Sequence, residues 1–190
     1  YISRKRSVAT NPIQDVFKQV NRRFVELEAS DPEKLQDAQW MKENLPFTGE
    51  LFLGHLRYGT FGGNTIEQCH PFLRQSNWKT RNLVLAGNFN MTNVDELFEQ
   101  LVDLGQHPKQ MADTVTILEK IGHFLDEAND EIYYKHKDKF SKKEITKVIE
   151  EELDLQEILT QSAKYWDGGY VMCGLMGHGD AFALRDPNAI

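Results

Sequence analysis

The chain has 190 residues, of which 40% are hydrophobic and 27% charged, and its formal net charge at pH 7 is −7. This composition fits one soluble domain, and no apolar run reaches the length of a membrane span. The low cysteine content makes a reducing, cytoplasmic setting the expectation. The acidic balance argues against non-specific binding of nucleic acids or anionic membranes, where a basic face supplies the affinity. Two cysteines, Cys69 and Cys173, provide no disulfide framework.

The ends of the chain predict a fragment of a longer protein. The sequence starts at Tyr1, its first methionine is Met41, and it stops at Ile190 just after a turn signal. We therefore expect both ends to be cuts through a larger polypeptide.

The N-terminal quarter predicts helices, because it contains no glycine before Gly49. Asn11 can cap a helix with Pro12 at its first position, and apolar residues recur at helical spacing as far as Leu27. A second short helix is expected to start at Asp31–Pro32 and to run through Met41.

The middle of the chain predicts strands and tight loops. A strand is expected over 51–58, a long polar loop over 61–79, and a short strand over 82–87 that is buried on both faces. The segment 87–90, Gly-Asn-Phe-Asn, is expected to form the turn that leads into the next helix.

Further helices and a hairpin are expected in the C-terminal half. The pairs Thr92/Asp95 and Ser141/Glu144 both match the capping-box pattern, and the second helix is expected to run towards residues 158–159. Gly105 suits a helix C-terminus. The segments 169–175 and 181–185 are expected to pair as a hairpin across 177–179.

Arg57 stands at the end of the expected strand, where a guanidinium can clamp a carboxylate with two parallel hydrogen bonds. It can equally pair with a surface acid, and exposed arginine is the commoner case. His55, by itself, is more often a packed histidine than a catalyst.

The expected turn at 87–90 has two interpretations. It can project the Asn88 amide and the backbone N–H of Phe89 towards one point, as an oxyanion requires. Alternatively, its asparagines simply satisfy turn geometry. Asp113 is likewise either a helix N-cap or a carboxylate that binds the ammonium group of a ligand.

The neighbours Cys69 and His70 invite a nucleophile–base interpretation, but adjacent residues rarely have the geometry for proton transfer. Cys173 is expected to be a small buried side chain inside an apolar strand. His55, the two cysteines and His70 lack any recognised spacing for metal ligands.

Several short motifs occur in an order that is typical of one family. They are G-H-L-R-Y-G-T at 54–60, H-P-F at 70–72, L-A-G-N-F-N-M-T-N at 85–93, A-D-T at 112–114, G-G-Y at 168–170 and A-L-R-D-P-N-A-I at 183–190. Together they resemble the glutaminase domain of class II glutamine amidotransferases over about residues 50–125 and 166–190. The terminal R-D-P block is similar to the amidophosphoribosyltransferase branch of that family.

The resemblance implies roles for individual residues in binding L-glutamine. Arg57 would hold the α-carboxylate and Asp113 the α-ammonium group. Thr60 and the loop around His70 would line the same pocket.

The resemblance also implies a mechanism. Asn88 and the N–H of Phe89 would form the oxyanion hole. In the family an N-terminal cysteine attacks the side-chain amide of glutamine, with its own α-amino group as the base. No such cysteine is among these 190 residues, so we expect the fragment by itself to be inactive.

The implied fold is α+β, the αββα four-layer sandwich of N-terminal-nucleophile hydrolases. It would be a single domain over 1–190, incomplete because its N-terminal strands are missing, with helical insertions at about 1–45 and 129–165. The parent would pass ammonia to a phosphoribosyltransferase domain of the same chain, in the first committed step of purine nucleotide synthesis.

The resemblance implies a homo-oligomeric parent and no cofactor within this segment. Magnesium would belong to the phosphoribosyl pyrophosphate site elsewhere in the parent, and whether the parent carries an iron–sulfur cluster stays open.

Two departures from the family pattern leave an alternative. Phe89 stands in place of a glycine in the oxyanion turn, where a positive φ would be costly, and Val115 stands in place of a glutamate. A non-catalytic module that binds an amino acid or a partner protein on a degenerate amidotransferase fold would explain both. A hydrolase that uses Cys69 is a third possibility.

Overall fold

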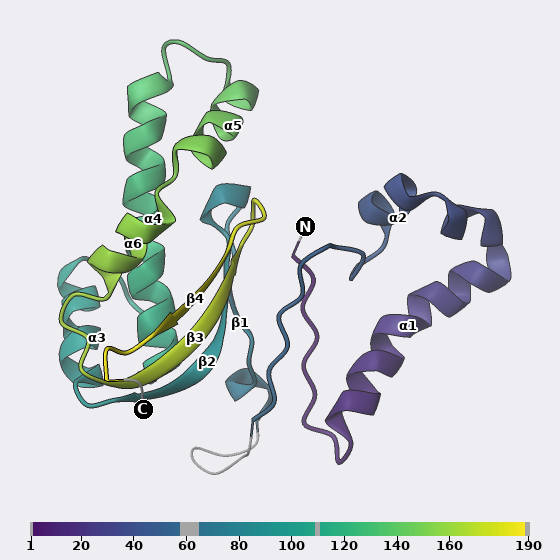
Figure 1. Ribbon diagram of the computed structural model, residues 1–190, viewed down its shortest axis with the longest axis horizontal. Helices are drawn as coiled ribbons and strands as arrows, with labels where there is room; N and C mark the ends of the chain where they lie inside the picture. Colours follow the sequence, from purple (N-terminus) through teal and green to yellow (C-terminus); the bar gives the residue numbers. More distant parts are fainter. Residues whose placement is uncertain (1, 58–64, 109–110, 189–190) are drawn as a thin grey trace. The chain divides into compact units, whose positions relative to one another are not determined.

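The computed structural model describes residues 2–57, 65–108 and 111–188. The chain divides into two compact units, Tyr1–Pro71 and Phe72–Ile190, each of which is described by itself (Figure 1). Within the described residues, no helix combines the length and apolar character that a membrane crossing needs.

The described part of the first unit contains helices and no strand. Its elements are α1 (Pro12–Ser30), the 3-10 helix η1 (Pro32–Gln36), α2 (Ala38–Asn44) and the 3-10 helix η2 (Ile66–Gln68). The Asn11 side chain accepts a hydrogen bond from the backbone N–H of Gln14 at 3.3 Å, so the expected cap is confirmed. The second expected helix is two elements, because Asp37 ends η1 and caps α2 through the N–H of Trp40 at 2.9 Å.

The strand expected over 51–58 is wrong for its described residues, 51–57, none of which lies in a strand. Leu51, Phe52 and Leu56 are instead exposed. Apolar alternation alone does not make a strand, since each strand also needs a neighbour to share its backbone hydrogen bonds. The described part of the first unit contains no strand that could pair with this segment.

The second unit is built on one antiparallel sheet, so the expected α+β class is confirmed at this level. Its strands are β1 (Phe72–Arg74), β2 (Leu83–Met91), β3 (Gly168–Met176) and β4 (Ala181–Arg185), paired in the order β1-β2-β3-β4. The hairpin of β3 and β4 is confirmed. β1 lies within the segment expected to be a long polar loop, where three residues gave too short a pattern to predict a strand.

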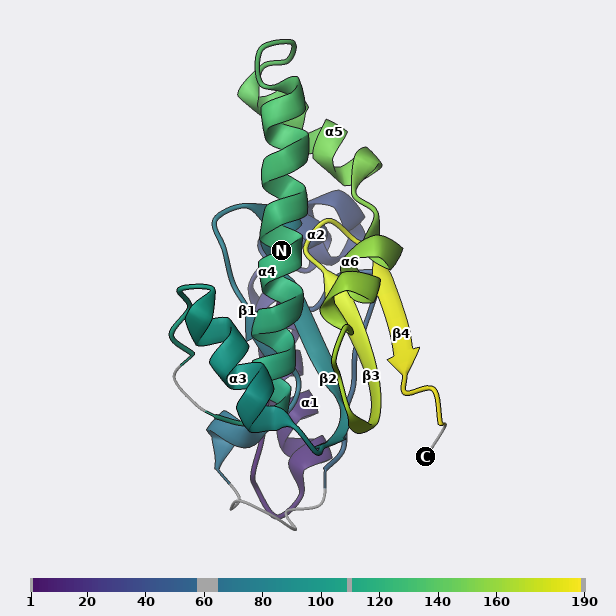
Figure 2. The ribbon, with the colours of Figure 1, turned by 90° about the vertical axis from the view of Figure 1, so that its left-hand side faces the viewer.

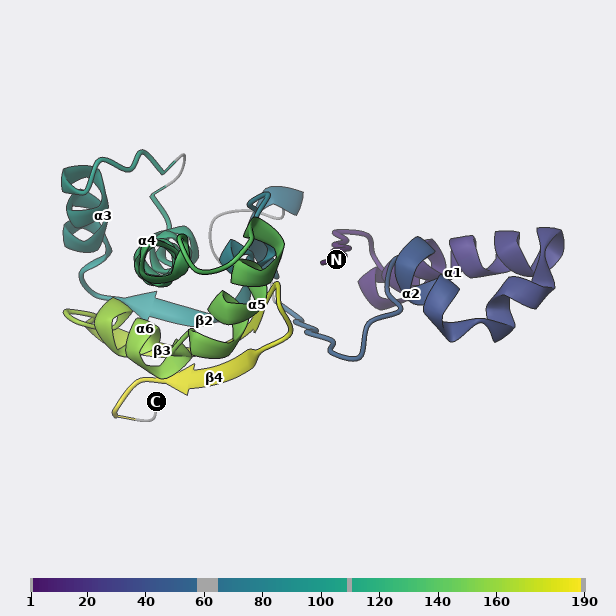
Figure 3. The same cartoon turned by 90° about the horizontal axis from the view of Figure 1, so that it is seen from above.

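In the described part of the second unit the sheet is accompanied by the 3-10 helix η3 (Lys79–Arg81) and by four α-helices: α3 (Val94–Asp103), α4 (Asp113–His136), α5 (Lys142–Glu152) and α6 (Leu155–Ser162). α3, α4 and α6 lie over the same face of the sheet, and α4 continues beyond the sheet to meet α5 (Figures 1, 2 and 3). The core lies between this face and the helices, and includes Leu83, Leu85, Leu97, Ile117, Ile121, Leu125, Ile158 and Met172.

The other face of the sheet is the one to which Asn88, Val171, Cys173 and Ala183 belong, since strand residues alternate between faces. These four residues are exposed, with Val171 at 49%. Val84 and Ala86 belong to the same face but are buried, so the expectation that the strand at 82–87 is buried on both faces is confirmed over residues 83–86. Cys173 was expected to be buried, and that prediction is wrong: it is exposed, and the core under the helices is formed by the residues of the opposite face, such as Met172.

The helix-start signals gave mixed results. The capping box of α5 is confirmed, with Ser141 and Glu144 each bonded to the other's backbone N–H. The capping box expected from Thr92 is wrong, because its hydroxyl bonds to the Asp167 carboxylate and Asn93 is the N-cap. The helix expected to run on towards residues 158–159 ends at Glu152, with Leu153 as its C-cap, and a separate helix, α6, starts after Asp154.

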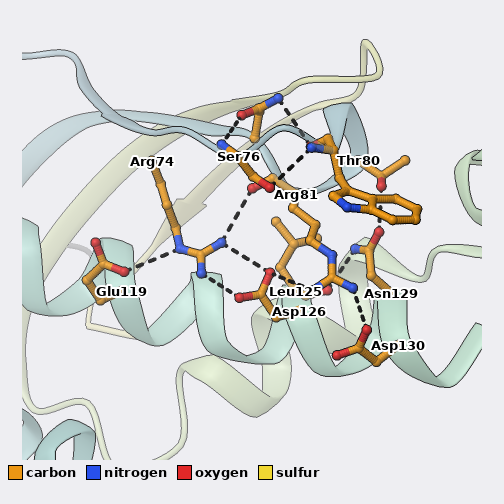
Figure 4. Close-up of polar contacts among 11 residues, drawn as sticks. Arg74, Ser76, Thr80, Arg81, Glu119, Leu125, Asp126, Asn129 and Asp130 are labelled. Atoms are coloured by element: carbon orange, nitrogen blue, oxygen red, sulfur yellow. Dashed lines mark hydrogen bonds and ion pairs between the residues drawn. The ribbon is translucent and has the colours of Figure 1, made fainter. Parts of the chain in front are cut away.

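Arg74 fastens β1 to α4 (Figure 4). Its Nη2 and Nη1 donate to the two carboxylate oxygens of Asp126 at 2.5 and 3.2 Å, and its Nε donates to Glu119 at 3.3 Å. Burial alone lowers the pKa of Arg74, but the hydrogen bonds and charges of Asp126 and Glu119 raise it overall. A Cβ at Gly122 would lie 2.2 Å from Nε of Arg74, so this glycine lets the arginine lie across the helix.

Candidate functional site

The residues expected to bind glutamine fall into both units. Arg57 and His70 belong to the first unit, while Asn88, Phe89 and Asp113 belong to the second. Thr60 lies outside the described residues. Each part of the candidate site is therefore described within its own unit.

Arg57 is exposed, and its Nη1 donates to the backbone carbonyl of Gln68 at 3.1 Å. This contact places the guanidinium next to the segment that leads to His70. The His70 side chain is buried, and its ring stacks on that of His55 with centroids 4.5 Å apart. The structure thus brings together Arg57, His70 and His55.

The surroundings of His70 disfavour its protonated form. Burial, then the charges of His55 and Arg57, lower the pKa of His70 from 6.5 to about 4. His70 is therefore neutral at pH 7, and its ring can serve as a hydrogen-bonding wall of a pocket rather than as a cation.

Cys69 has contacts that do not match a nucleophile–base pair. Its thiol lies 3.5 Å from the carbonyl oxygen of Thr65 and 3.9 Å from that of Ser7. The neighbouring His70 ring packs on His55 instead. Within the described residues, no group of three or more His, Cys, Asp or Glu side chains could hold a metal ion.

The turn expected at 87–90 is wrong, because these residues continue β2. Asn88 pairs with Val171 and Phe89 with Tyr170, in a register that runs unbroken to Met91. Nine residues of ladder with β3 outweigh the turn preference of the Gly-Asn sequence. Phe89 consequently needs no positive φ, which removes the expected strain at this position.

The alternation of the ladder fixes how Asn88 and Phe89 are presented. The Phe89 side chain packs partly buried against the helix-covered core, so the Asn88 side chain lies on the opposite, exposed face. The backbone N–H of Tyr170 donates to the carboxylate of Asp186, and its C=O accepts from the backbone N–H of Asp186. The backbone N–H of its partner Phe89 therefore points to the side of β2 away from β3.

Asp113 links the start of α4 to the end of β2. Its Oδ2 accepts a hydrogen bond from the backbone N–H of Met91 at 3.0 Å. The expected role as an N-cap is wrong, because Ala112 occupies that position and Asp113 is the first helical residue. A carboxylate accepts several hydrogen bonds, so the contact with Met91 leaves capacity for an ammonium group.

Two features of the structure were not expected from the sequence. Asp186, in the R-D-P motif, is 1% exposed and accepts from the backbone N–H groups of Tyr170 and Asn188, which ties the end of β4 to β3. The motif itself was the available signal for this buried acid. Arg4 and Arg6 both reach the segment that carries His70, and nothing in their spacing with that segment pointed to the contact.

Comparison with known proteins finds partial sequence similarity to amidophosphoribosyltransferases. The chain is 32% identical to that of Methanocaldococcus jannaschii over 84 residues, 44% of this chain and 17% of the relative. It is 36% identical to that of Lacticaseibacillus casei over 76 residues, 40% of this chain and 38% of the relative. It is 28% identical to that of Pasteurella multocida over 151 residues, 77% of this chain and 25% of the relative.

The matches cover well under half of the length of each of these relatives. No family model matches the chain. Among solved structures, a glutamine phosphoribosylpyrophosphate amidotransferase from B. subtilis, complexed with ADP and GMP, matches 70% of this chain and 22% of its own, at 22% identity and a TM-score of 0.46.

Proposed function

We propose that this chain is part of the glutamine-hydrolysing domain of an amidophosphoribosyltransferase. The observation that carries the proposal is the sequence similarity to proteins of that name, which extends over 77% of the chain in one case. The parent would convert glutamine and phosphoribosyl pyrophosphate to phosphoribosylamine, glutamate and pyrophosphate, as a step in purine synthesis.

In this proposal two charges recognise the free amino acid. Arg57 binds the α-carboxylate through the fork of its guanidinium, and Asp113 binds the α-ammonium group. The anchoring of Asp113 by the Met91 N–H supports this role, because a fixed carboxylate loses less side-chain entropy on binding. Thr60 and His70 would line the pocket.

The nucleophile for glutamine hydrolysis would be a cysteine other than Cys69 and Cys173. An N-terminal cysteine of the parent would attack the glutamine amide, and Asn88 and the Phe89 N–H would stabilise the oxyanion. The orientation of the Phe89 N–H away from β3 supports the second assignment. Ammonia would then pass to a phosphoribosyltransferase domain of the same chain.

The finer fold in this proposal is the four-layer sandwich. The exposed face of the sheet, with Val171, Cys173 and Ala183, would pack against a second sheet that belongs to the parent.

Steady-state kinetics of the parent test the glutamine site. Arg57→Ala and Asp113→Asn should each raise KM for glutamine by about tenfold to a hundredfold, because each leaves a charged group of the substrate unpaired. KM values that match the wild type would show that the two charges do not hold glutamine.

The gene sequence upstream of Tyr1 separates this function from the non-catalytic alternative. A cysteine at the mature N-terminus is required for hydrolysis. An upstream sequence without one would favour a binding module, for which the substitutions at Phe89 and Val115 are the motivating observations.

A further inference from the structure

Two arginines near the start of the chain share one face of an extended segment. Arg4 and Arg6 are two residues apart, a spacing that puts both side chains on the same side of an extended backbone. The Nη1 of Arg4 donates to the carbonyl of Pro71 at 3.4 Å. The Nη1 of Arg6 donates to the carbonyls of Glu67 and Cys69, both at 3.3 Å.

The two guanidinium groups are held by carbonyl oxygens and not by carboxylates. Neither Arg4 nor Arg6 forms an ion pair within the part of the chain that the structure describes. The carboxylate of Asp15 accepts hydrogen bonds from the hydroxyl of Ser7, the residue after Arg6, and from the side-chain amide of Gln19. In the described parts of the chain, two positive charges therefore lie two residues apart without an ion-pair partner.

The charge of Arg6 affects the pKa of Arg4. Burial, and then the charge of Arg6, lower the pKa of Arg4. Both side chains are half-buried, whereas Lys5 between them is exposed. Half-buried like charges at close range repel each other, and an anion placed between them would relieve that repulsion.

We propose that Arg4 and Arg6, hereafter the arginine pair, form a binding site for a phosphate group. The described hydrogen bonds use only Nη1 of each guanidinium, and neither Nε nor Nη2 of the two arginines is among the buried atoms without a partner. These two nitrogens of each arginine form the fork that would contact an oxyanion. Arginine matches phosphate oxygens in two-point contacts. A phosphate dianion balances both charges, whereas a single carboxylate would leave one of them uncompensated.

The arginine pair is separate from the glutamine clamp of the proposed function. Arg57 reaches the carbonyl of Gln68, whereas the pair reaches the carbonyls of residues 67, 69 and 71. Phosphate binding can be measured without any turnover of glutamine, so this inference and the proposed function fail independently.

The test is a titration of the 190-residue chain with inorganic phosphate at constant ionic strength. Binding is followed through the Nε–Hε NMR signals of Arg4 and Arg6. Arg6→Met should weaken binding about tenfold or more, since it removes a charge-assisted contact. Lys5→Met is the matched control: it removes the same charge from the same segment but from the exposed face, and binding should stay within about twofold.

Arg6→Lys is the second variant, for the case in which Arg6→Met does not fold. It keeps the positive charge of Arg6 and removes only the two-point contact of the guanidinium. It should weaken phosphate binding while thermal unfolding stays close to that of the wild type. A parallel titration with glycerol 3-phosphate distinguishes free phosphate from a phosphate ester as the source. Signals that do not saturate, or equal weakening in Arg6→Met and Lys5→Met, would overturn the proposal.

Discussion

At the residue scale, Asp113 has a structural contact and a proposed binding role that substitutions can separate. Asp113→Asn keeps an oxygen that can accept from the Met91 N–H but removes the charge. We expect its free energy of unfolding to stay within about 0.5 kcal/mol of wild type, and Asp113→Ala to lose about 1 to 2 kcal/mol. Urea denaturation measures both, and equal losses would mean that the charge itself stabilises the fold.

His70 should make the stability depend on pH. Its pKa is about 4 in the folded chain and about 6.5 when unfolded, so the unfolded state binds more protons between these values. The free energy of unfolding should therefore fall as the pH decreases from about 6.5 to 4, by at most about 3 kcal/mol, and be fully restored above pH 6.5.

Variants assign this pH dependence to one residue. His70→Asn should flatten the fall, whereas the same change at the exposed His107 should leave the slope as in the wild type. Urea denaturation at a series of pH values gives both curves. An unchanged slope in His70→Asn would contradict the burial argument.

At the scale of elements, the contact between β1 and α4 depends on Arg74 and Gly122 together. Arg74→Ala should cost about 2 to 4 kcal/mol, because it removes the cation from Glu119 and leaves Asp126 with only the longer contact to Arg81, at 3.7 Å. Gly122→Ala should also destabilise, since the added Cβ meets the arginine side chain.

The double variant gives the decisive comparison. Without the arginine side chain, Gly122→Ala should become neutral or stabilising by up to about 1 kcal/mol, as alanine favours a helix. The two changes should therefore be strongly non-additive in a double-mutant cycle of unfolding free energies. Additive losses would show that the glycine does not make room for Arg74.

An element can be predicted from the sequence when the residues that determine it lie close together in the chain. The caps at Asn11 and Ser141 act within one helical turn, so the sequence was sufficient to place them. The path of 87–90 depends on pairing with β3, some eighty residues later, and the expected turn was wrong for that reason. Sites follow the same rule: single residues could be nominated, but their partners, such as Met91 for Asp113, come from the fold.

At the scale of the whole molecule, the exposed face of the sheet offers a test of the four-layer sandwich. Cys173 is exposed on this face in the 190-residue chain. If the parent supplies a second sheet there, alkylation of Cys173 should slow by at least tenfold in the parent, measured in a Cys69→Ser background. Equal rates in the two proteins would show that the face stays uncovered.

The central claim is that one bound glutamine is held by Arg57 at its carboxylate and by Asp113 at its ammonium group. A crystal structure of the parent with a non-hydrolysable glutamine analogue tests this most directly. We predict that the Arg57 guanidinium and the Asp113 carboxylate both lie within hydrogen-bonding distance, about 3 Å, of the same ligand. An analogue bound elsewhere, or one that contacts neither residue, would contradict the account.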